Sequence, residues 1–318
     1  MCTGLTITKG NFYLARNLDI NYYFGQRVVV VPRKYPFKYR CDKTNDNHYA
    51  IIGMGIQMND HLLFADAMNE KGLGMAELNF KGFAKYPDGQ VEGKNSITCY
   101  EIISWILQNH ETVKQVKETL KNTILVNIPL MEGLPCAPVH WIIADKDESI
   151  VLEQTEDGLK VHDNPVGVLT NNPPFEYHMM SLRDYRGIST ENGPSTLLKG
   201  IDLPPLGVGM GGIGLPGDSS PNSRFVKAAF LRSHAAWSDD AEENIALIFH
   251  ILDNVAMVKG TVMGNDGKDE YTYYTSCING TTGDYIYKTH KHRNTVTFNL
   301  FDEDLDGDKL IDKGYLDC

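Results

Sequence analysis

Features that would assign this sequence to a membrane or to nucleic acid are missing. No run of apolar residues approaches the roughly 20 that an α-helix needs to cross a bilayer, and the first ten residues lack the basic start and apolar stretch of a secretory signal. Basic residues are few, with 30 Lys and Arg against 41 Asp and Glu, a net charge of −11. Because nucleic-acid binding needs a basic surface, we expect neither a nucleic-acid nor a membrane partner, and a cytoplasmic protein.

Cysteine motifs are also missing. The six cysteines show no CxxC pair and no zinc-ligand spacing. We therefore expect mostly free thiols, with Cys99, Cys136 and Cys277 packed in the interior. The sequence His290-Lys291-His292 has no third ligand nearby. We expect no metal and no cofactor.

Low-complexity segments, repeats and linkers are absent from the 318 residues. Length alone allows about two domains or one large layered domain. Patterns typical of strands occupy the first third of the chain, patterns typical of helices the middle, and strand patterns return towards the end. The strands are expected at residues 5–7, 12–15, 27–31, 50–54, 73–78, 139–144, 149–154, 271–277, 285–287 and 295–300, and the helices near 102–106, 113–120, from about 221, and from about 239. Thr112 with Gln115, and Asp239 with Glu242, are the expected capping boxes of the second and the fourth helix. This order indicates an α+β protein in which sheets pair the two ends of the chain.

Two motifs resemble ligand-binding sites, one for a dinucleotide and one for calcium, but the residues around them do not fit such sites. Residues 207–212 match a dinucleotide-binding glycine pattern, but prolines flank the motif where a strand and a helix are required. Asp302, Asp304 and Asp306 match the first half of a calcium loop, whose twelfth position is Lys313 instead of Glu. We interpret the first segment as a loop and the second as a hairpin turn at Asp306-Gly307.

Cys2 is distinguished by its position. Removal of Met1 would leave one residue with both a thiol and a free α-amine, whose pKa values near 8.5 and 8 allow them to share a proton. The amine can then serve as the base of its own nucleophile. Residues 13–19 form a hairpin return that brings Arg16 and Asp19 towards Cys2, where a cation stabilises a thiolate. The sequence thus predicts an amidase with an N-terminal cysteine nucleophile.

Over nearly its whole length the sequence resembles the choloylglycine hydrolases, the N-terminal-nucleophile hydrolases that comprise bile salt hydrolases and penicillin V acylases. The matching stretches are Met1-Cys2-Thr3-Gly4-Leu5, Arg16-Asn17-Leu18-Asp19, Asn69-Glu70-Lys71-Gly72-Leu73-Gly74, Leu78-Asn79-Phe80, His140-Trp141, Gly167-Val168-Leu169-Thr170-Asn171-Asn172-Pro173, Gly214-Leu215-Pro216-Gly217-Asp218 and Ser223-Arg224-Phe225. The resemblance implies one domain over residues 1–318, an αββα four-layer sandwich of antiparallel sheets, and a homotetramer.

The resemblance also assigns roles to particular residues. It implies that Cys2 is the nucleophile, with Arg16 and Asp19 as its polarising partners. Asn79 and Asn171 would position the oxyanion and the amine, and Arg224 would complete the charged cluster. The glycine-rich loop before Arg224 would bring backbone close to this site.

Two positions bear on substrate choice within the family. Asn79 is typical of bile salt hydrolases, where penicillin V acylases often carry Tyr. Glu77 departs from the family, in which Gly is usual, and we expect its side chain to lie on the opposite strand face from Asn79. The sequence therefore predicts hydrolysis of glycine- or taurine-conjugated bile salts, with penicillin V or another N-acyl amide as the alternative substrate.

A steroid needs an apolar cavity with a few polar groups. Two segments offer apolar residues that could line such a cavity. The candidates are Leu18, Tyr22, Phe24, Leu130, Met131 and Leu134.

Overall fold

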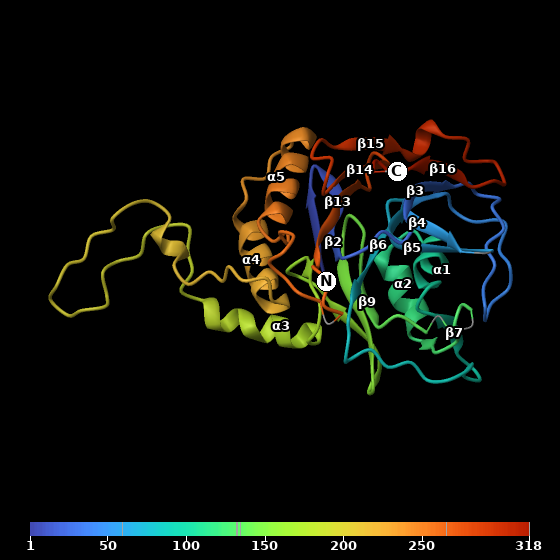
Figure 1. The fold of residues 1–318 in the computed structure, drawn as a ribbon, viewed down its shortest axis with the longest axis horizontal. Coiled ribbons are helices and arrows are strands. Elements are labelled where there is room, and N and C mark those ends of the chain that lie inside the picture. Colours follow the sequence, from blue (N-terminus) through green and yellow to red (C-terminus); the bar gives the residue numbers. More distant parts are fainter. Residues whose placement is uncertain (59, 132, 134, 265, 318) are drawn as a thin grey trace.

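Two antiparallel sheets form the centre of the computed structural model (Figure 1). The structure describes residues 1–58, 60–131, 133, 135–264 and 266–317. The first sheet has the strand order β12-β1-β2-β13-β14-β15. Its strands are β1 (Cys2–Lys9), β2 (Asn11–Ile20), β12 (Val168–Leu169), β13 (Tyr271–Asn279), β14 (Asp284–Thr289) and β15 (Val296–Asn299). Strands from the two ends of the chain therefore pair in one sheet, as predicted.

The second sheet has the strand order β11-β10-β9-β6-β5-β4-β3-β16. Its strands are β3 (Arg27–Val31), β4 (Ile51–Met58), β5 (His61–Asn69), β6 (Gly74–Asn79), β9 (Val139–Ala144), β10 (Ser149–Thr155), β11 (Gly158–Asp163) and β16 (Ile311–Gly314). A separate parallel pair joins β7 (Asn95–Thr98) and β8 (Thr123–Val126). Because β15 and β16 belong to different sheets, the expected hairpin turn at Asp306-Gly307 is wrong. The chain crosses there from one sheet to the other.

Helices cover the outer faces of both sheets (Figure 1). On the second sheet lie α1 (Ile102–Leu107) and α2 (Val113–Leu120), and beside the first lie α3 (Phe175–Ser181), α4 (Pro221–His234) and α5 (Ala241–Asp253). Short 3-10 turns are η1 (Leu182–Tyr185), η2 (Met210–Gly212) and η3 (Leu300–Asp302). The αββα architecture is confirmed.

Side-chain caps fix where these helices begin. Thr112 accepts a hydrogen bond of 3.3 Å from the Gln115 amide, as the capping pattern predicted. The cap of α5 is Asp240, one residue beyond the expected Asp239, because its carboxylate reaches the amides at the helix start.

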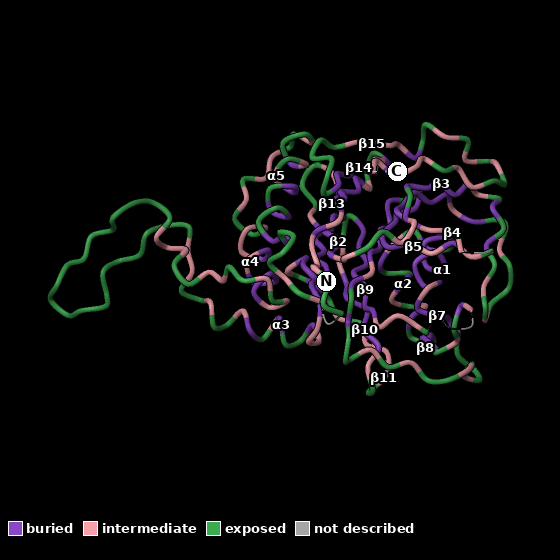
Figure 2. The backbone as a smooth tube through the Cα atoms, in the orientation of Figure 1, coloured by how far each residue is buried: buried purple, intermediate pink, exposed green. Residues whose placement is uncertain are grey.

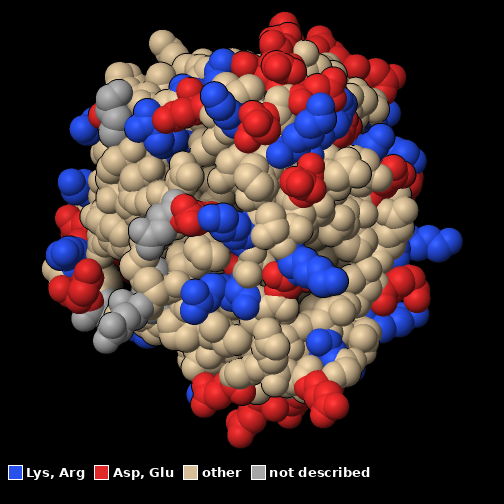
Figure 3. Space-filling view, turned by 90° about the vertical axis from the view of Figure 1, so that its right-hand side faces the viewer, with Lys and Arg blue, Asp and Glu red and all other residues tan. Residues whose placement is uncertain are grey.

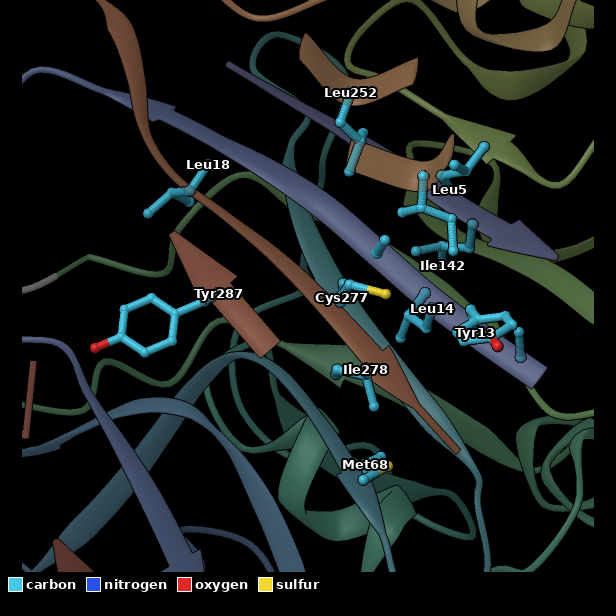
Figure 4. Packing of buried hydrophobic residues seen from close by; sticks show 14 of the residues in the cluster. Leu5, Tyr13, Leu14, Leu18, Met68, Ile142, Leu252, Cys277, Ile278 and Tyr287 are labelled. Carbon is cyan, nitrogen blue, oxygen red and sulfur yellow. The ribbon is translucent and has the colours of Figure 1, made fainter. Parts of the chain in front are cut away.

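The main core lies between the sheets, where side chains that alternate along facing strands meet. Leu14 of the first sheet lies over Gly74 of the second, and Ile142 of the second lies over Gly4 of the first (Figure 4), and the buried backbone runs through the middle of the molecule (Figure 2). A second core beneath α1 and α2 includes Trp141 and Ile143. Adjacent residues of β9 thus serve different cores, which explains the continuous apolar run at 139–144.

The chain between η1 and α4 extends away from this body as an arm (Figure 1, yellow). The arm, residues 186–217, contains the glycine-rich stretch. The expectation that this stretch brings backbone close to the candidate site is wrong. Gly207, Gly209 and Gly212 have open space around them, and among the described residues neither hydrophobic core includes a residue of the arm.

Charged side chains of both signs are interspersed on the face opposite the arm (Figure 3). In the described part of the chain, no helix is long and apolar enough to cross a bilayer, and no group of three or more His, Cys, Asp and Glu side chains could hold a metal ion. Asp306 of the calcium-like loop forms a 2.9 Å ion pair with Arg33.

Candidate active site

Cys2 lies at the start of β1, beside the end of β2. The hairpin turns at Gly10, whose positive φ of 64° suits glycine, and its register pairs Cys2 with Leu18 and Gly4 with Arg16. The turn thus brings residues 16–19 back to Cys2, as the sequence predicted. The Cys2 side chain is 4% exposed and lines a cavity.

Arg16 is the cation that contacts the candidate nucleophile. Its Nη2 donates a hydrogen bond of 2.8 Å to the Cys2 sulfur, and its Nη1 donates one of 3.0 Å to the Ala65 carbonyl. Ala65 is skipped in the register between β4 and β5, where Met54 faces Asp66 and Gly55 faces Phe64. This β-bulge leaves the Ala65 carbonyl available to Arg16, consistent with the frequent occurrence of bulges at functional sites.

Behind Arg16 lies a buried acid that sequence reasoning missed. Asp66 is 3.8 Å from the guanidinium and accepts hydrogen bonds from Tyr274 (2.5 Å) and Tyr285 (2.6 Å). Burial disfavours the charge of Arg16, but the negative groups of Cys2, Tyr274 and Asp66 raise its pKa above the ordinary value. The guanidinium therefore stays protonated. The one signal in the sequence was an aspartate within the otherwise apolar strand at 62–68.

Arg224 and Asn171 hold the backbone of Cys2. Arg224 Nη1 donates to the Cys2 carbonyl (2.5 Å) and to the Thr3 hydroxyl (2.8 Å), and its Nη2 donates to Asn171 Oδ1 (2.7 Å). The same Asn171 oxygen accepts the Cys2 amide at 2.9 Å. Arg224 reaches this position because Ser220 caps α4 one turn earlier. Burial lowers the Arg224 pKa.

Asp19 lies buried beside these groups. Its Oδ1 accepts a 2.6 Å hydrogen bond from Thr272, whereas its Oδ2 has no partner in the described part of the structure. Burial raises the Asp19 pKa, although Arg224 and the chain's ammonium oppose the shift. The Met1 ammonium donates to the Asp19 carbonyl (2.5 Å) and to Glu270 (3.0 Å). The sequence-predicted acid is thus next to the N-terminus, with one oxygen unused.

Asn79 ends strand β6 at the edge of the same cavity. Its Oδ1 accepts a 3.0 Å hydrogen bond from the Lys81 amide, and its carbonyl accepts one of 2.9 Å from Asn171. Glu77 also lines this cavity, so the expectation that it lies on the opposite face from Asn79 is wrong. Side chains alternate along a strand, and residues two apart therefore share a face.

The cavity beside Cys2 has a volume of about 390 Å³ and is mainly apolar. Leu18, Tyr22 and Phe24 line it, as expected, together with Met1, Asp19, Ile20, Ile56, Met58, Leu63, Phe64, Ala65, Glu77, Leu78, Asn79, Tyr100, Ala137 and Val139.

The second expected wall segment is placed differently. Leu130 and Met131 are not among the described residues that line the cavity, and Leu130 is buried with 5% exposure. Leu134 lies outside the described residues.

The site combines a thiol, a guanidinium that can stabilise the thiolate, side-chain amides and an apolar cavity. These groups suit nucleophilic attack by sulfur on a carbonyl carbon. All six sequence-predicted polar residues meet within this one region, drawn from β1, β2, β6, α4 and the segment after β12.

Comparisons with known proteins also indicate a hydrolase that cleaves amide bonds. Residues 2–313 match the protein family described as "Linear amide C-N hydrolases, choloylglycine hydrolase family". The chain is 43% identical to conjugated bile acid hydrolase of Lactobacillus gasseri over 98% of this chain and 99% of the relative.

Two solved structures share the fold. The C2A variant of conjugated bile acid hydrolase from Clostridium perfringens superposes with a TM-score of 0.92 at 40% identity, over 99% of this chain and 97% of the other. Penicillin V acylase from Agrobacterium tumefaciens gives 0.77 at 19% identity, over 98% and 90%, and shows the fold alone. The chain therefore belongs to the choloylglycine hydrolase family and is a hydrolase of linear amides.

Proposed function

We propose that this protein hydrolyses the amide bond of glycine- or taurine-conjugated bile salts, with Cys2 as the nucleophile. One observation carries the proposal: the Cys2 sulfur, in hydrogen-bond contact with Arg16, opens into an apolar cavity of about 390 Å³. Such a cavity suits an apolar acyl group. Two relatives, 43% and 41% identical, are a conjugated bile acid hydrolase and a bile salt hydrolase/transferase, which supports a steroid acyl group over the phenoxyacetyl group of penicillin V.

The active form begins at Cys2. With Met1 present, the Cys2 nitrogen is an amide that donates to Asn171 and cannot act as a base. Met1 also lines the cavity. Its removal would create the free α-amine, enlarge the cavity at the nucleophile and leave Asn171 Oδ1 to orient the new amine.

The reaction then follows from the placement of each group. The amine takes the thiol proton, and the thiolate, stabilised by Arg16, attacks the amide carbon. The Oδ1 atom of Asn79 accepts a hydrogen bond from the backbone amide of Lys81. The side-chain NH₂ group of Asn79 is therefore the group that donates to the developing oxyanion. Asp19 stabilises the α-ammonium, and Arg224 fixes Asn171 and the Cys2 carbonyl.

Collapse of the tetrahedral intermediate breaks the C–N bond. The leaving nitrogen takes its proton from the α-ammonium, which leaves a thioester on Cys2. Water, deprotonated by the free amine, then attacks the thioester, releases the bile acid and restores the thiol. Leu18, Tyr22 and Phe24 would contact the steroid.

The chain is also proposed to act as one domain over residues 1–318 and to assemble as a homotetramer. The arm supports assembly, because apolar side chains on it are highly exposed: Leu197 (82%), Leu206 (96%), Val208 (99%) and Ile213 (73%). An apolar surface of this kind marks a contact site for another protein surface.

The test is release of glycine and taurine from conjugated bile salts, with penicillin V measured in parallel. Cys2→Ala is the matched control. We expect bile-salt turnover by the wild-type chain and none by Cys2→Ala. Turnover of penicillin V alone would contradict the proposed substrate, and activity that survives in Cys2→Ala would contradict the proposed nucleophile.

A further inference from the structure

A buried histidine and a buried glutamate lie behind the candidate active site and have no part in the proposed reaction. The register of β9 and β10 pairs Trp141 with Leu152. His140 and Glu153 are therefore the next residues that lie opposite each other. Both are 0% exposed, and His140 Nδ1 is 2.9 Å from Glu153 Oε1. The pair belongs to the second sheet and faces the first, because Ile142, two positions along β9, lies in the main core.

Both members of the pair contact the segment that follows β12 of the first sheet. His140 Nε2 lies 3.0 Å from the Thr170 carbonyl oxygen. The Glu153 carboxylate accepts hydrogen bonds of 3.0 and 3.2 Å from the Phe175 amide. Asn171 lies between these two contacts along the chain.

A second histidine holds the Asn171 backbone itself. His178 Nε2, on α3, lies 2.8 Å from the Asn171 carbonyl oxygen. The His178 ring stacks on Phe225, with the centroids 5.0 Å apart. Two successive carbonyls, those of Thr170 and Asn171, are thus each bonded to an imidazole, one from the second sheet and one from α3.

The hydrogen bonds of His140 require a charge on its ring. The Glu153 carboxylate and the Thr170 carbonyl are both acceptors, so each ring nitrogen carries a hydrogen. An imidazolium in the interior needs an opposite charge close by, and Glu153 supplies it. The charge of Glu153 therefore allows His140 to donate to the Thr170 carbonyl.

The Asn171 side chain in turn holds the nitrogen of Cys2. Its Oδ1 accepts a hydrogen bond of 2.9 Å from that nitrogen, and its Nδ2 donates one of 2.9 Å to the Asn79 carbonyl. In the proposed reaction the same nitrogen becomes the α-amine that takes the thiol proton. A shift of the Asn171 backbone would therefore misplace the base with respect to the thiol.

We propose that Glu153, His140 and His178 are positioning residues for the proposed reaction. They fix the backbone of Asn171, and through its side chain they orient the α-amine of the processed Cys2. This inference rests on the proposed function. The described residues that line the cavity include neither the three positioning residues nor Asn171. Their effect is therefore on the chemical step and not on substrate binding.

The experiment compares Glu153→Gln with the wild type, both beginning at Cys2, in the hydrolysis of a taurine conjugate. Glutamine keeps the size of the side chain but removes its charge, so His140 retains one ring hydrogen and cannot donate on both sides. We expect kcat to fall by about 10–100-fold with little change in KM. A wild-type kcat, with or without a change in KM, would overturn the inference.

His48 provides a matched control, because it makes similar hydrogen bonds away from the cavity beside Cys2. It is 7% exposed, and its ring nitrogens lie 2.7 and 2.8 Å from the carbonyl oxygens of Tyr49 and Tyr35. His48→Gln should lower the midpoint of urea unfolding, as Glu153→Gln does, but retain the wild-type kcat. An equal loss of kcat in both variants would indicate general destabilisation and overturn the inference.

A second variant covers the case in which Glu153→Gln does not fold. His178→Phe keeps a ring that packs against Phe225 and removes the donor to the Asn171 carbonyl. It should also lower kcat with little change in KM. A wild-type kcat for His178→Phe would overturn the inference.

Alkylation of Cys2 separates this inference from the proposed function. If the wild type hydrolyses no conjugated bile salt, the proposed function fails. The rate at which iodoacetamide modifies Cys2, followed by mass spectrometry, then decides the role of Glu153, because the thiolate is the reactive form and the oriented α-amine generates it. Glu153→Gln should react several-fold more slowly than the wild type and His48→Gln. Equal rates for all three proteins would overturn the inference.

Discussion

Asp66 lies 3.8 Å from the Arg16 guanidinium, and each side chain is only 1% exposed. Arg16 in turn donates a hydrogen bond to the Cys2 sulfur. Tyr274 and Tyr285, more than 200 residues away in sequence, hold the Asp66 carboxylate by their hydroxyls. Both sheets and both ends of the chain therefore position the cation that faces the Cys2 sulfur.

Replacement Asp66→Asn should destabilise the protein by about 3–5 kcal/mol, because it leaves the buried Arg16 charge without its carboxylate. Urea unfolding measures the change. Asp60→Asn, which removes the exposed partner of Lys38, should leave the midpoint nearly unchanged. Equal midpoints for Asp66→Asn and wild type would contradict a stabilising role for the pair.

A chain that keeps a residue before Cys2 should show no turnover, because the Cys2 nitrogen is then an amide. The measurement uses a cleavable N-terminal extension, with mass spectrometry to confirm each N-terminus and the bile-salt assay before and after cleavage. Activity should appear only when Cys2 becomes the first residue. Equal rates before and after cleavage would rule out the α-amine as the base.

Asn79→Ala should lower kcat by about 10²–10³, the usual effect of losing one oxyanion donor, with a smaller change in KM. Steady-state kinetics with a taurine conjugate test this. Asn95→Ala, at the exposed start of β7, is the control and should retain the wild-type kcat. A change in KM alone would assign Asn79 to substrate binding.

Glu77→Gln should raise stability above neutral pH and have little effect in acid. Burial raises the Glu77 pKa from 4.5 to about 7, so the folded chain holds this proton more firmly than the unfolded chain. The resulting stabilisation is complete below about pH 4.5 and is lost as the pH rises through about 7. Urea unfolding should show Glu77→Gln about 1–3 kcal/mol more stable than wild type near pH 8. A difference that does not change with pH would contradict the raised pKa.

Replacing Leu206 and Val208 by serine should shift the protein to smaller assemblies, because both side chains are almost fully exposed on the arm. Light scattering after gel filtration measures the molecular mass of the assembly in solution. The double replacement Val161→Ser and Phe83→Ser, at partly exposed positions of the body, is the control. An unchanged mass for the arm variant would exclude the arm from assembly.

Local patterns were sufficient for most elements of the fold. Alternation and apolar runs predicted the strands at 139–144 and 271–277, and Thr112 predicted the start of α2, because these signals depend on neighbours a few residues away. The crossing between sheets at 306–307 was missed, since strand pairing across the molecule leaves little trace in a turn sequence.

The sequence by itself predicted Cys2 as the nucleophile with its hairpin partners Arg16 and Asp19, and it identified the family. A chemical group at position 2 and a short hairpin are local features. Only the tertiary structure brought Asp66 behind Arg16, placed Glu77 in the cavity and directed the glycine-rich arm away from it. The physical reason is that the charge which a side chain meets depends on strands far apart in sequence, which only packing brings together.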